Sequence, residues 1–211
     1  MKLRDRENIL ALGGFLGAAA LIAALTLALV SQLTAEPIRQ ARENNRINAF
    51  HRLRLPDFDR TGDVKESDGV LFYPVEKDGK TVGFIGQGKV SGYGGEIEIL
   101  VGFKPDGEIT AVQILRHKET PGLGAVVCER TFQRTIFNLF DKAPEITENK
   151  LLDQFDFRNA GDYQKLRLIK DGGNVMYLTG ATVTSSAVNK GVKGICRAFC
   201  NGNFSGSMER E

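Results

Sequence analysis

The 211 residues of the chain are enough for one globular domain with appendages, and 42% of them are hydrophobic, which is ordinary for a folded protein. The net charge of +2 at pH 7 is too small to indicate nucleic-acid binding. The two histidines, His51 and His117, are too few for a His-rich metal site, so the sequence predicts no metal centre. Three cysteines are also too few for a secreted disulfide scaffold.

A long apolar segment near the N-terminus is the first predicted element. Every residue of Ile9–Val30 except one threonine is apolar or small, and no charge appears between Glu7 and Glu36. At roughly 1.5 Å per residue, this run spans about 30 Å, the thickness of a bilayer core. A secretory signal peptide has a shorter apolar region and a small-residue cleavage site, which Leu33–Ala35 matches poorly. The sequence therefore favours a cytoplasmic leader and retained transmembrane anchor over residues 1–35.

Basic residues flank this anchor on both sides. Lys2, Arg4 and Arg6 precede it, and five arginines follow it between positions 39 and 54. Charge counting alone does not decide the orientation. A short basic leader before a first span is typical of a signal anchor, which leaves the rest of the chain outside the cytoplasm. We expect a single-pass protein of the cell inner (plasma) membrane with its C-terminal domain on the extracytoplasmic, periplasmic side.

A polar, Arg-rich stalk helix is predicted over residues 36–56, starting at Glu36-Pro37. The folded domain follows over residues 57–201, and a Gly/Ser-rich flexible tail over 202–211. Asp-Gly turns between apolar runs are a strong hairpin signal. They predict three hairpins and an α+β fold, an antiparallel sheet with flanking helices. The paired runs are Val70–Val75 with Thr81–Ile85, Ile97–Phe103 with Ile109–Leu115, and Leu166–Ile169 with Val175–Leu178.

Two helices are predicted from apolar residues at helical spacing. One extends from Ala125 to Phe140, and the other has Val188 to Phe199 on its apolar face. Cys196 and Cys200 lie four residues apart on this second helix and so share a face, where we expect them to be small buried side chains. An Fe–S or redox pair is the alternative, but the closer C-x-x-C spacing is missing.

Small and hydroxylated residues fill the segment just before that second helix. Gly180 and Ala181 let a backbone approach a ligand, and Thr184, Ser185 and Ser186 are residues that start helices. A helix N-terminus suits an anion such as phosphate. A helix cap without a ligand is the alternative interpretation. We predict the binding residues here to be Thr179, Gly180, Ala181, Thr182, Thr184 and Ser185.

A second candidate segment follows the predicted strand that ends at Leu115. Proline stiffens this loop and its glycines remove side chains, which makes a flat wall suited to an aromatic ring system. The polar side chains beside it are placed to serve the polar edges of such a ring. The loop residues are Glu119, Thr120, Pro121, Gly122, Leu123 and Gly124. Upstream, the Ser91–Gly95 glycine cluster around Tyr93 is either a flexible turn or a backbone that approaches a ligand.

Together these two segments carry a family resemblance. Thr179–Ser185 resembles the flavinylation signature of the FMN-binding domain in the G subunit of Rnf-type electron-transport complexes, and is similar to that of the C subunit of sodium-translocating NADH:quinone reductase. His117–Gly124 resembles the flavin-contacting loop of that family. Met176 stands where the family signature usually has Asp.

The resemblance implies a cofactor, partners and a function. It implies FMN attached covalently through its phosphate to Thr182, by a separate flavin transferase. The partners would be the other membrane and peripheral subunits of an Rnf complex, which couples ferredoxin oxidation and NAD reduction to ion translocation. The chain would be an electron-carrying subunit, not catalytic alone.

Two alternatives come from other function classes. A membrane-anchored FMN sensor or regulatory module would use the same domain without a role in ion pumping. A hydrolase would use Ser185 or Ser186 as nucleophile, His117 as base and Glu119 to orient it, but no G-x-S-x-G elbow is present.

Overall fold

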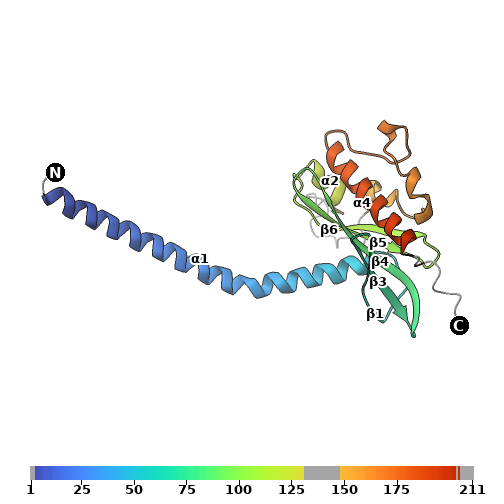
Figure 1. Cartoon of the computed structure of the whole chain (residues 1–211), viewed down its shortest axis with the longest axis horizontal. Helices are drawn as coiled ribbons and strands as arrows, with labels where there is room; N and C mark the ends of the chain where they lie inside the picture. The colour runs from blue at the N-terminus through green and yellow to red at the C-terminus, as the bar shows by residue number, and fades with distance from the viewer. Residues whose placement is uncertain (1–2, 131–147, 203, 205–211) are drawn as a thin grey trace, which may run out of the picture. The chain divides into compact units, whose positions relative to one another are not determined.

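A computed structural model describes residues 3–130, 148–202 and 204 of the chain (Figure 1). It divides into two compact units, Met1–Arg46 and Ile47–Glu211. The first unit consists of most of helix α1 (Leu3–His51). The second unit contains the sheet, the remaining helices and the candidate site.

Helix α1 contains the apolar segment. It is the one helix in the described part of the chain that is long and apolar enough to cross a membrane. Its mean hydropathy over a stretch of 18 residues is 2.2. The hydroxyls of Thr26 and Thr34 donate to the carbonyls of Ile22 and Val30 at 2.8 Å. These bonds satisfy the two hydroxyls within the helix, as an apolar environment requires.

Residues 36–51 are helical, as expected, but no helix starts at Glu36-Pro37. Helix α1 continues through Pro37 without interruption and ends at His51. Proline removes one backbone donor, but a long helix tolerates the loss of a single hydrogen bond. The segment 36–51 is therefore the second half of one helix, and residues 52–56 lie beyond its end.

The sheet is antiparallel and six-stranded, in the order β1-β3-β4-β5-β6, with β2 also paired to β3. Two of the predicted hairpins, β3–β4 and β5–β6, are confirmed. Asp78 and Gly79 make the first turn with φ of 51° and 76°, the left-handed conformation that a two-residue hairpin turn needs. The strands are β1 Arg60–Thr61, β2 Lys65–Ser67, β3 Val70–Lys77, β4 Lys80–Ser91, β5 Glu96–Phe103 and β6 Ile109–Arg116.

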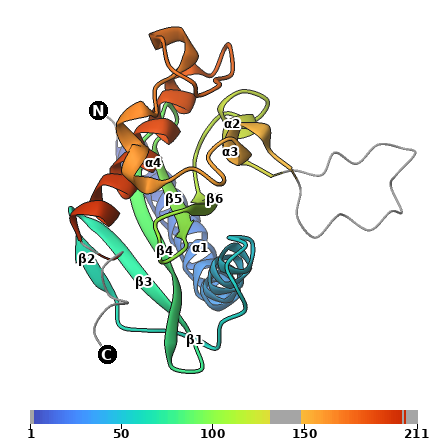
Figure 2. The same cartoon turned by 90° about the vertical axis from the view of Figure 1, so that its right-hand side faces the viewer.

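Short helical segments and one long helix follow the sheet in sequence. The long helix, α4, crosses one face of the sheet (Figure 2). The expected Ala125–Phe140 helix starts as α2 and ends at Cys128, and its residues Ile136, Phe137 and Phe140 lie outside the described residues. The helical segments are α2 Gly124–Cys128, α3 Lys150–Asp153, η2 Ala160–Lys165, η3 Ile169–Asp171 and α4 Thr182–Asn201.

The third predicted hairpin is wrong. Its two runs meet in a single parallel bridge between Leu168 and Val175. The 3-10 turn η3 begins at Ile169, the last residue of the first run, and Gly172 ends it at φ 75°. Leu168 and Val175 are both buried, so the apolar pattern reports burial in an irregular connection and not a strand pair.

Alternate residues along β5 point to opposite faces of the sheet and pack into two different hydrophobic cores. Ile97, Ile99 and Val101 face the core beneath α4, while Leu100 faces a smaller core with Leu53, just after the end of α1. This alternation follows from the two-residue period of a strand. The sheet is thus covered on both faces within the second unit.

Glycines in β4 allow α4 to lie close to the sheet. A Cβ on Gly86 would stand 2.7 Å from Ile195 Cγ2, and one on Gly88 would stand 2.8 Å from Ile195 Cγ1. At the far end of α4, Phe199 stacks on Phe103 with ring centroids 4.4 Å apart. These contacts anchor α4 along its length, so its first turn is held in a defined position.

The cysteines and the expected tail also differ in part from the sequence analysis. Cys128 and Cys196 are buried, and burial raises the pKa of each thiol to about 12. Cys200 is exposed, because the helix turns it away from the core. Phe204, within the expected tail, is buried against Phe72, whereas residues 203 and 205–211 lie outside the described residues.

Candidate functional site

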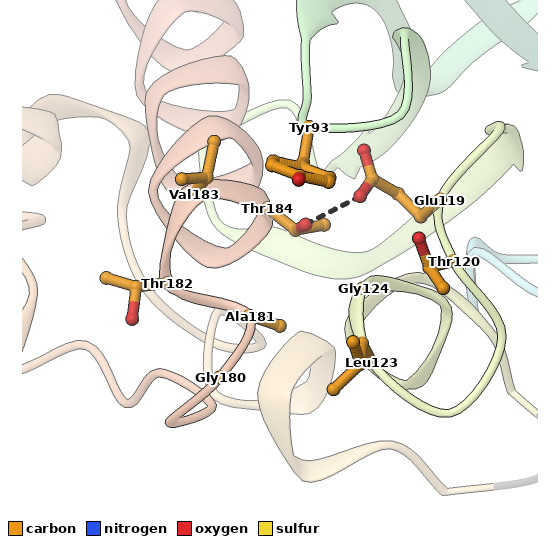
Figure 3. Close-up of a pocket in the computed structure, with 10 residues that line it drawn as sticks. All are labelled: Tyr93, Glu119, Thr120, Leu123, Gly124, Gly180, Ala181, Thr182, Val183 and Thr184. Atoms are coloured by element: carbon orange, nitrogen blue, oxygen red, sulfur yellow. Dashed lines mark hydrogen bonds between the residues drawn. The ribbon is translucent and has the colours of Figure 1, made fainter.

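A cleft with a volume of about 330 Å³ opens at the start of α4 (Figure 3). Three segments form it: the turn after β4, the loop after β6, and the connection into α4. The lining residues are Tyr93, Glu119, Thr120, Leu123, Gly124, Gly180, Ala181, Thr182, Val183 and Thr184. The volume lies at the lower end of the range for small-molecule and cofactor sites.

The first turn of α4 lies beside this cleft and has no side-chain cap. The helix begins at Thr182, with Ala181 as its N-cap and no side-chain cap. Thr184 and Ser185 are therefore inside the helix, and the expectation that they cap it is wrong. The Ser185 hydroxyl instead donates to the Ala181 carbonyl at 3.0 Å and accepts from the Leu178 amide at 3.2 Å. The first amides of α4 consequently have no side-chain cap and remain available to an anion.

Glu119 joins the three segments that make the cleft. Its side chain is buried, and its Oε2 accepts a hydrogen bond of 2.7 Å from the Thr184 hydroxyl. Its Oε1 accepts one of 3.0 Å from the Gly94 amide. Both carboxylate oxygens thus bind protein groups, so Glu119 organises the cleft from within.

The glycine cluster after β4 has a role that the sequence left open. A Cβ on Gly94 would collide with the carbonyl oxygen of Lys118, and one on Gly92 would collide with the Glu119 carboxylate. The backbone therefore approaches the 117–124 loop, which neither of the two sequence interpretations described. This close packing places Tyr93 at the edge of the cleft with three quarters of its surface exposed.

The loop after β6 turns tightly into α2. The Thr120 carbonyl accepts hydrogen bonds from the amides of Leu123 and Ala125 at 3.2 and 3.1 Å. This turn brings Thr120, Leu123 and Gly124 to the cleft, whereas Pro121 and Gly122 do not line it. A Cβ on Gly122 would meet open space, and its φ of 76° explains the glycine instead.

His117 and the serines do not form a hydrolase triad. The His117 Nδ1 accepts the Glu119 amide at 3.2 Å, and its Nε2 lies 3.2 Å from Glu129 Oε1. The Ser185 hydroxyl donates to a backbone carbonyl. Within the described residues, no hydrogen bond joins His117 to Ser185 or Ser186, so the nucleophile and base of that alternative are not brought together.

Comparison with known proteins identifies the family. The FMN-binding domain family matches residues 92–196, which include every segment of the cleft. The chain is 30% identical over 195 residues to the G subunit of the proton-translocating ferredoxin:NAD(+) oxidoreductase complex of Clostridium ljungdahlii, covering 91% of this chain and 92% of that protein. The chain belongs to the G-subunit family of ion-translocating oxidoreductase complexes.

Other proteins similar to this G subunit have related names. It is 28% identical over 217 residues to the G subunit of the Na(+)-translocating ferredoxin:NAD(+) oxidoreductase complex of Acetobacterium woodii, covering 93% of this chain and 94% of that protein. Among solved structures, the C subunit of the Na(+)-translocating NADH-quinone reductase from Parabacteroides distasonis is 14% identical, with a TM-score of 0.48, covering 82% of this chain and 97% of that one.

The lining of the cleft suits FMN, the cofactor for which the matching family is named. Tyr93 and Leu123 provide apolar surface for a flat ring, and Gly180 leaves room between them and the helix start. The Thr182 hydroxyl stands at the first residue of α4, beside uncapped amides that suit a phosphate. Among the described residues, no group of three or more His, Cys, Asp or Glu side chains could hold a metal ion.

Most of the predicted binding residues of this G subunit line the cleft. The four that do not are Thr179, Ser185, Pro121 and Gly122. Sequence reasoning missed Val183, which lines the cleft from the first turn of α4. It also missed two lysines, Lys170 and Lys190, that line a second cleft sharing Thr182 with the first. For Lys190, the available signal was its spacing with Thr182 and Ser186, four residues apart each time.

Proposed function

We propose that this G subunit binds FMN covalently, through an ester between the flavin phosphate and Thr182. In this role it transfers electrons within a membrane-bound ferredoxin:NAD oxidoreductase complex coupled to ion translocation. The observation that carries the proposal is the position of Thr182. Its hydroxyl-bearing side chain stands at the uncapped start of α4, on the edge of a cleft of cofactor size. The names of the relatives support the part of the proposal that concerns the ferredoxin:NAD oxidoreductase complex and ion translocation.

FMN supplies the redox chemistry when bound, and the protein supplies position and surroundings. Tyr93 and Leu123 are placed to pack against the ring, and Thr120 offers a hydroxyl at the same wall. Glu119 keeps the loop and α4 together through its bonds to Thr184 and Gly94. Its role is therefore to position the cleft walls, since both of its oxygens already accept hydrogen bonds.

The same proposal includes the topology and the partners. The apolar part of α1 anchors the chain in the cell membrane as a single span, and the FMN domain lies on the extracytoplasmic side. The other subunits of the complex are the electron donor, the electron acceptor and the ion pathway. A flavin transferase attaches the cofactor: the Thr182 oxygen displaces the leaving group of an activated FMN donor, such as a phosphoanhydride of FMN, and the hydroxyl proton goes to a base of the transferase.

In-gel fluorescence tests this proposal. The full-length protein is co-expressed with a flavin transferase, denatured and separated by electrophoresis, so that only covalent flavin remains to fluoresce. We expect the wild type to fluoresce and Thr182→Val to be dark, because valine keeps the shape and removes the oxygen that an ester needs. Thr179→Val is the matched control, since Thr179 is exposed and does not line the cleft.

The outcomes distinguish loss of the flavin attachment point from loss of folded protein. Equal amounts of Thr182→Val and wild type in the membrane fraction show that the dark band is not a loss of protein. A fluorescent Thr182→Val band would place the ester elsewhere and contradict the proposal. Copurification of the flavinylated wild type with other membrane subunits separates an electron carrier from a membrane-anchored sensor, which would purify without them.

A further inference from the structure

A second cleft, with a volume of about 300 Å³, lies beside the first. Thr182 and Val183 line both clefts, so the first turn of α4 forms the ridge between them. The other walls of the second cleft come from Ser91 at the end of β4, from Lys170 in η3, and from Lys190 in α4.

One face of α4 carries the polar groups of this second cleft. Thr182, Ser186 and Lys190 follow one another at four-residue intervals, which places their side chains one above another on the helix. Two hydroxyls and an ammonium group are thereby presented to the same space. Lys170 reaches that space from a separate element, so two positive charges converge on it.

The Thr182 side chain points away from the first cleft. In Figure 3 it lies on the far side of the helix start from Tyr93 and Leu123, while Ala181 points toward them. An ester oxygen at this position would hold a phosphate on the outer side of the ridge. The ring of the same ligand would still reach the apolar walls of the first cleft across the helix start.

The two clefts differ in charge. In the first, the one ionisable acid is Glu119, which is buried and hydrogen-bonded to Thr184 and Gly94. The second is lined by two lysines and no acid, although Asp171 Oδ1 lies 3.9 Å from the Lys170 Nζ. Within the described residues, Lys190 forms no ion pair, so its charge is available to an anion.

We propose that the second cleft is the phosphate site of the cofactor, with Lys170 and Lys190 as the residues that position the phosphate at Thr182. This inference rests on the proposed FMN function and adds that the ring and the phosphate occupy opposite sides of the α4 start. The lysines act by charge. They hold the dianionic phosphate of free FMN in a non-covalent complex, and the singly charged diester once a transferase has attached the flavin from an activated FMN donor. They make and break no bond.

The preference of the protein for FMN over riboflavin measures how much the two lysines contribute to phosphate binding. The full-length protein is prepared in detergent without the transferase, and its dissociation constants for FMN and for riboflavin, which lacks the phosphate, are compared. We expect wild type to prefer FMN about three- to tenfold, as two solvent-exposed charge pairs allow. Lys170→Gln with Lys190→Gln should remove this preference and leave riboflavin binding unchanged. Added salt should weaken the preference in wild type alone.

Lys193→Gln is the matched control. It removes the same charge from the same helix, and Lys193 lines neither cleft. A second readout uses the covalently loaded protein, whose phosphodiester gives a ³¹P resonance. The double variant should shift that resonance, and Lys193→Gln should leave it in place.

The results separate this inference from the function beneath it. A double variant that keeps both the FMN preference and the wild-type ³¹P resonance would overturn the phosphate site and leave the flavin function intact. Equal affinity of the wild type for FMN and riboflavin would also overturn the phosphate site and leave the flavin function intact. Absence of covalent flavin in the wild type, together with absence of binding of either free flavin, would overturn both.

Discussion

The Thr184 hydroxyl donates to Glu119 Oε2 at 2.7 Å, across 65 residues of sequence, and both side chains are buried. This bond ties the first turn of α4 to the loop after β6, the two walls of the cleft. The Gly94 amide binds the other oxygen of the same carboxylate, so a third segment depends on it. Glu119 is thus the junction that holds the flavin-domain segments in register.

Removal of the Thr184 hydroxyl should destabilise this junction. Thr184→Val keeps the shape but leaves a buried carboxylate oxygen without its donor, which costs about 1–3 kcal/mol. Thermal unfolding of the full-length protein should show a lower midpoint for Thr184→Val, and Thr184→Ser, which restores a hydroxyl, should recover most of the loss. A valine variant as stable as wild type would mean that the bond contributes nothing to folding.

Gly94 should not tolerate a side chain. A Cβ there would collide with the Lys118 carbonyl, and backbone cannot move aside as a flexible side chain could. We expect Gly94→Ala to lower stability by about 1–3 kcal/mol and to reduce flavin attachment, because the loop after β6 is displaced.

Gly194→Ala provides the control for that substitution. Gly194 lies inside α4 with nothing within 4 Å of its would-be Cβ. Alanine there should stabilise the helix by about 0.5–1 kcal/mol and leave flavin attachment unchanged. If the two alanine variants behave alike in denaturant unfolding and in-gel fluorescence, the close approach at Gly94 is not what constrains that residue.

Two neighbouring loop residues should differ in their effect on the flavin. Leu123 lines the cleft and Gly122 does not. Leu123→Ser should therefore change the absorption and fluorescence of the bound flavin, while Gly122→Ala should leave both spectra as in wild type. The Gly122 variant should only cost stability, about 1–2 kcal/mol, because its φ of 76° is unfavourable for alanine. A spectral change in Gly122→Ala alone would place the ring elsewhere.

Asp156 should make part of the stability dependent on pH. Burial raises its pKa from 3.8 to about 6, with Asp153 adding to the rise while the opposing Arg54 and Arg130 guanidiniums lower it. Its side chain is 4% exposed, and its Oδ2 lies 2.7 Å from Arg54 Nη1. The folded state therefore binds a proton more tightly than the unfolded state does.

The sign of the effect follows from this difference. Between about pH 4 and pH 6 the folded state holds more protons at Asp156, so this group's contribution to stability falls as the pH rises through that window. Asp156→Asn removes the titration. The stability of the variant relative to wild type should therefore rise by on the order of 2 kcal/mol from pH 4 to pH 6. Urea unfolding at several pH values measures this, and a constant difference would contradict the shifted pKa.

The sequence by itself determined those elements that depend only on residues close together in the chain. The apolar run of Ile9–Val30 predicts a helix of membrane length, and Asp78-Gly79 predicts the β3–β4 turn, because only a few residues accept the left-handed backbone it needs. The Thr179–Ser185 and His117–Gly124 motifs likewise located two walls of the cleft. Each of these signals is complete within about ten to thirty residues.

Tertiary structure decided what depends on partners distant in sequence. Leu168 and Val175 carry a strand-like pattern, yet burial under the rest of the domain holds them in an irregular connection. Glu119 was expected to serve the ring edge, but packing of three segments commits it to Thr184 and Gly94. Lys170 reaches the Thr182 ridge only because η3 folds back beside α4, and no local pattern in the sequence encodes that approach.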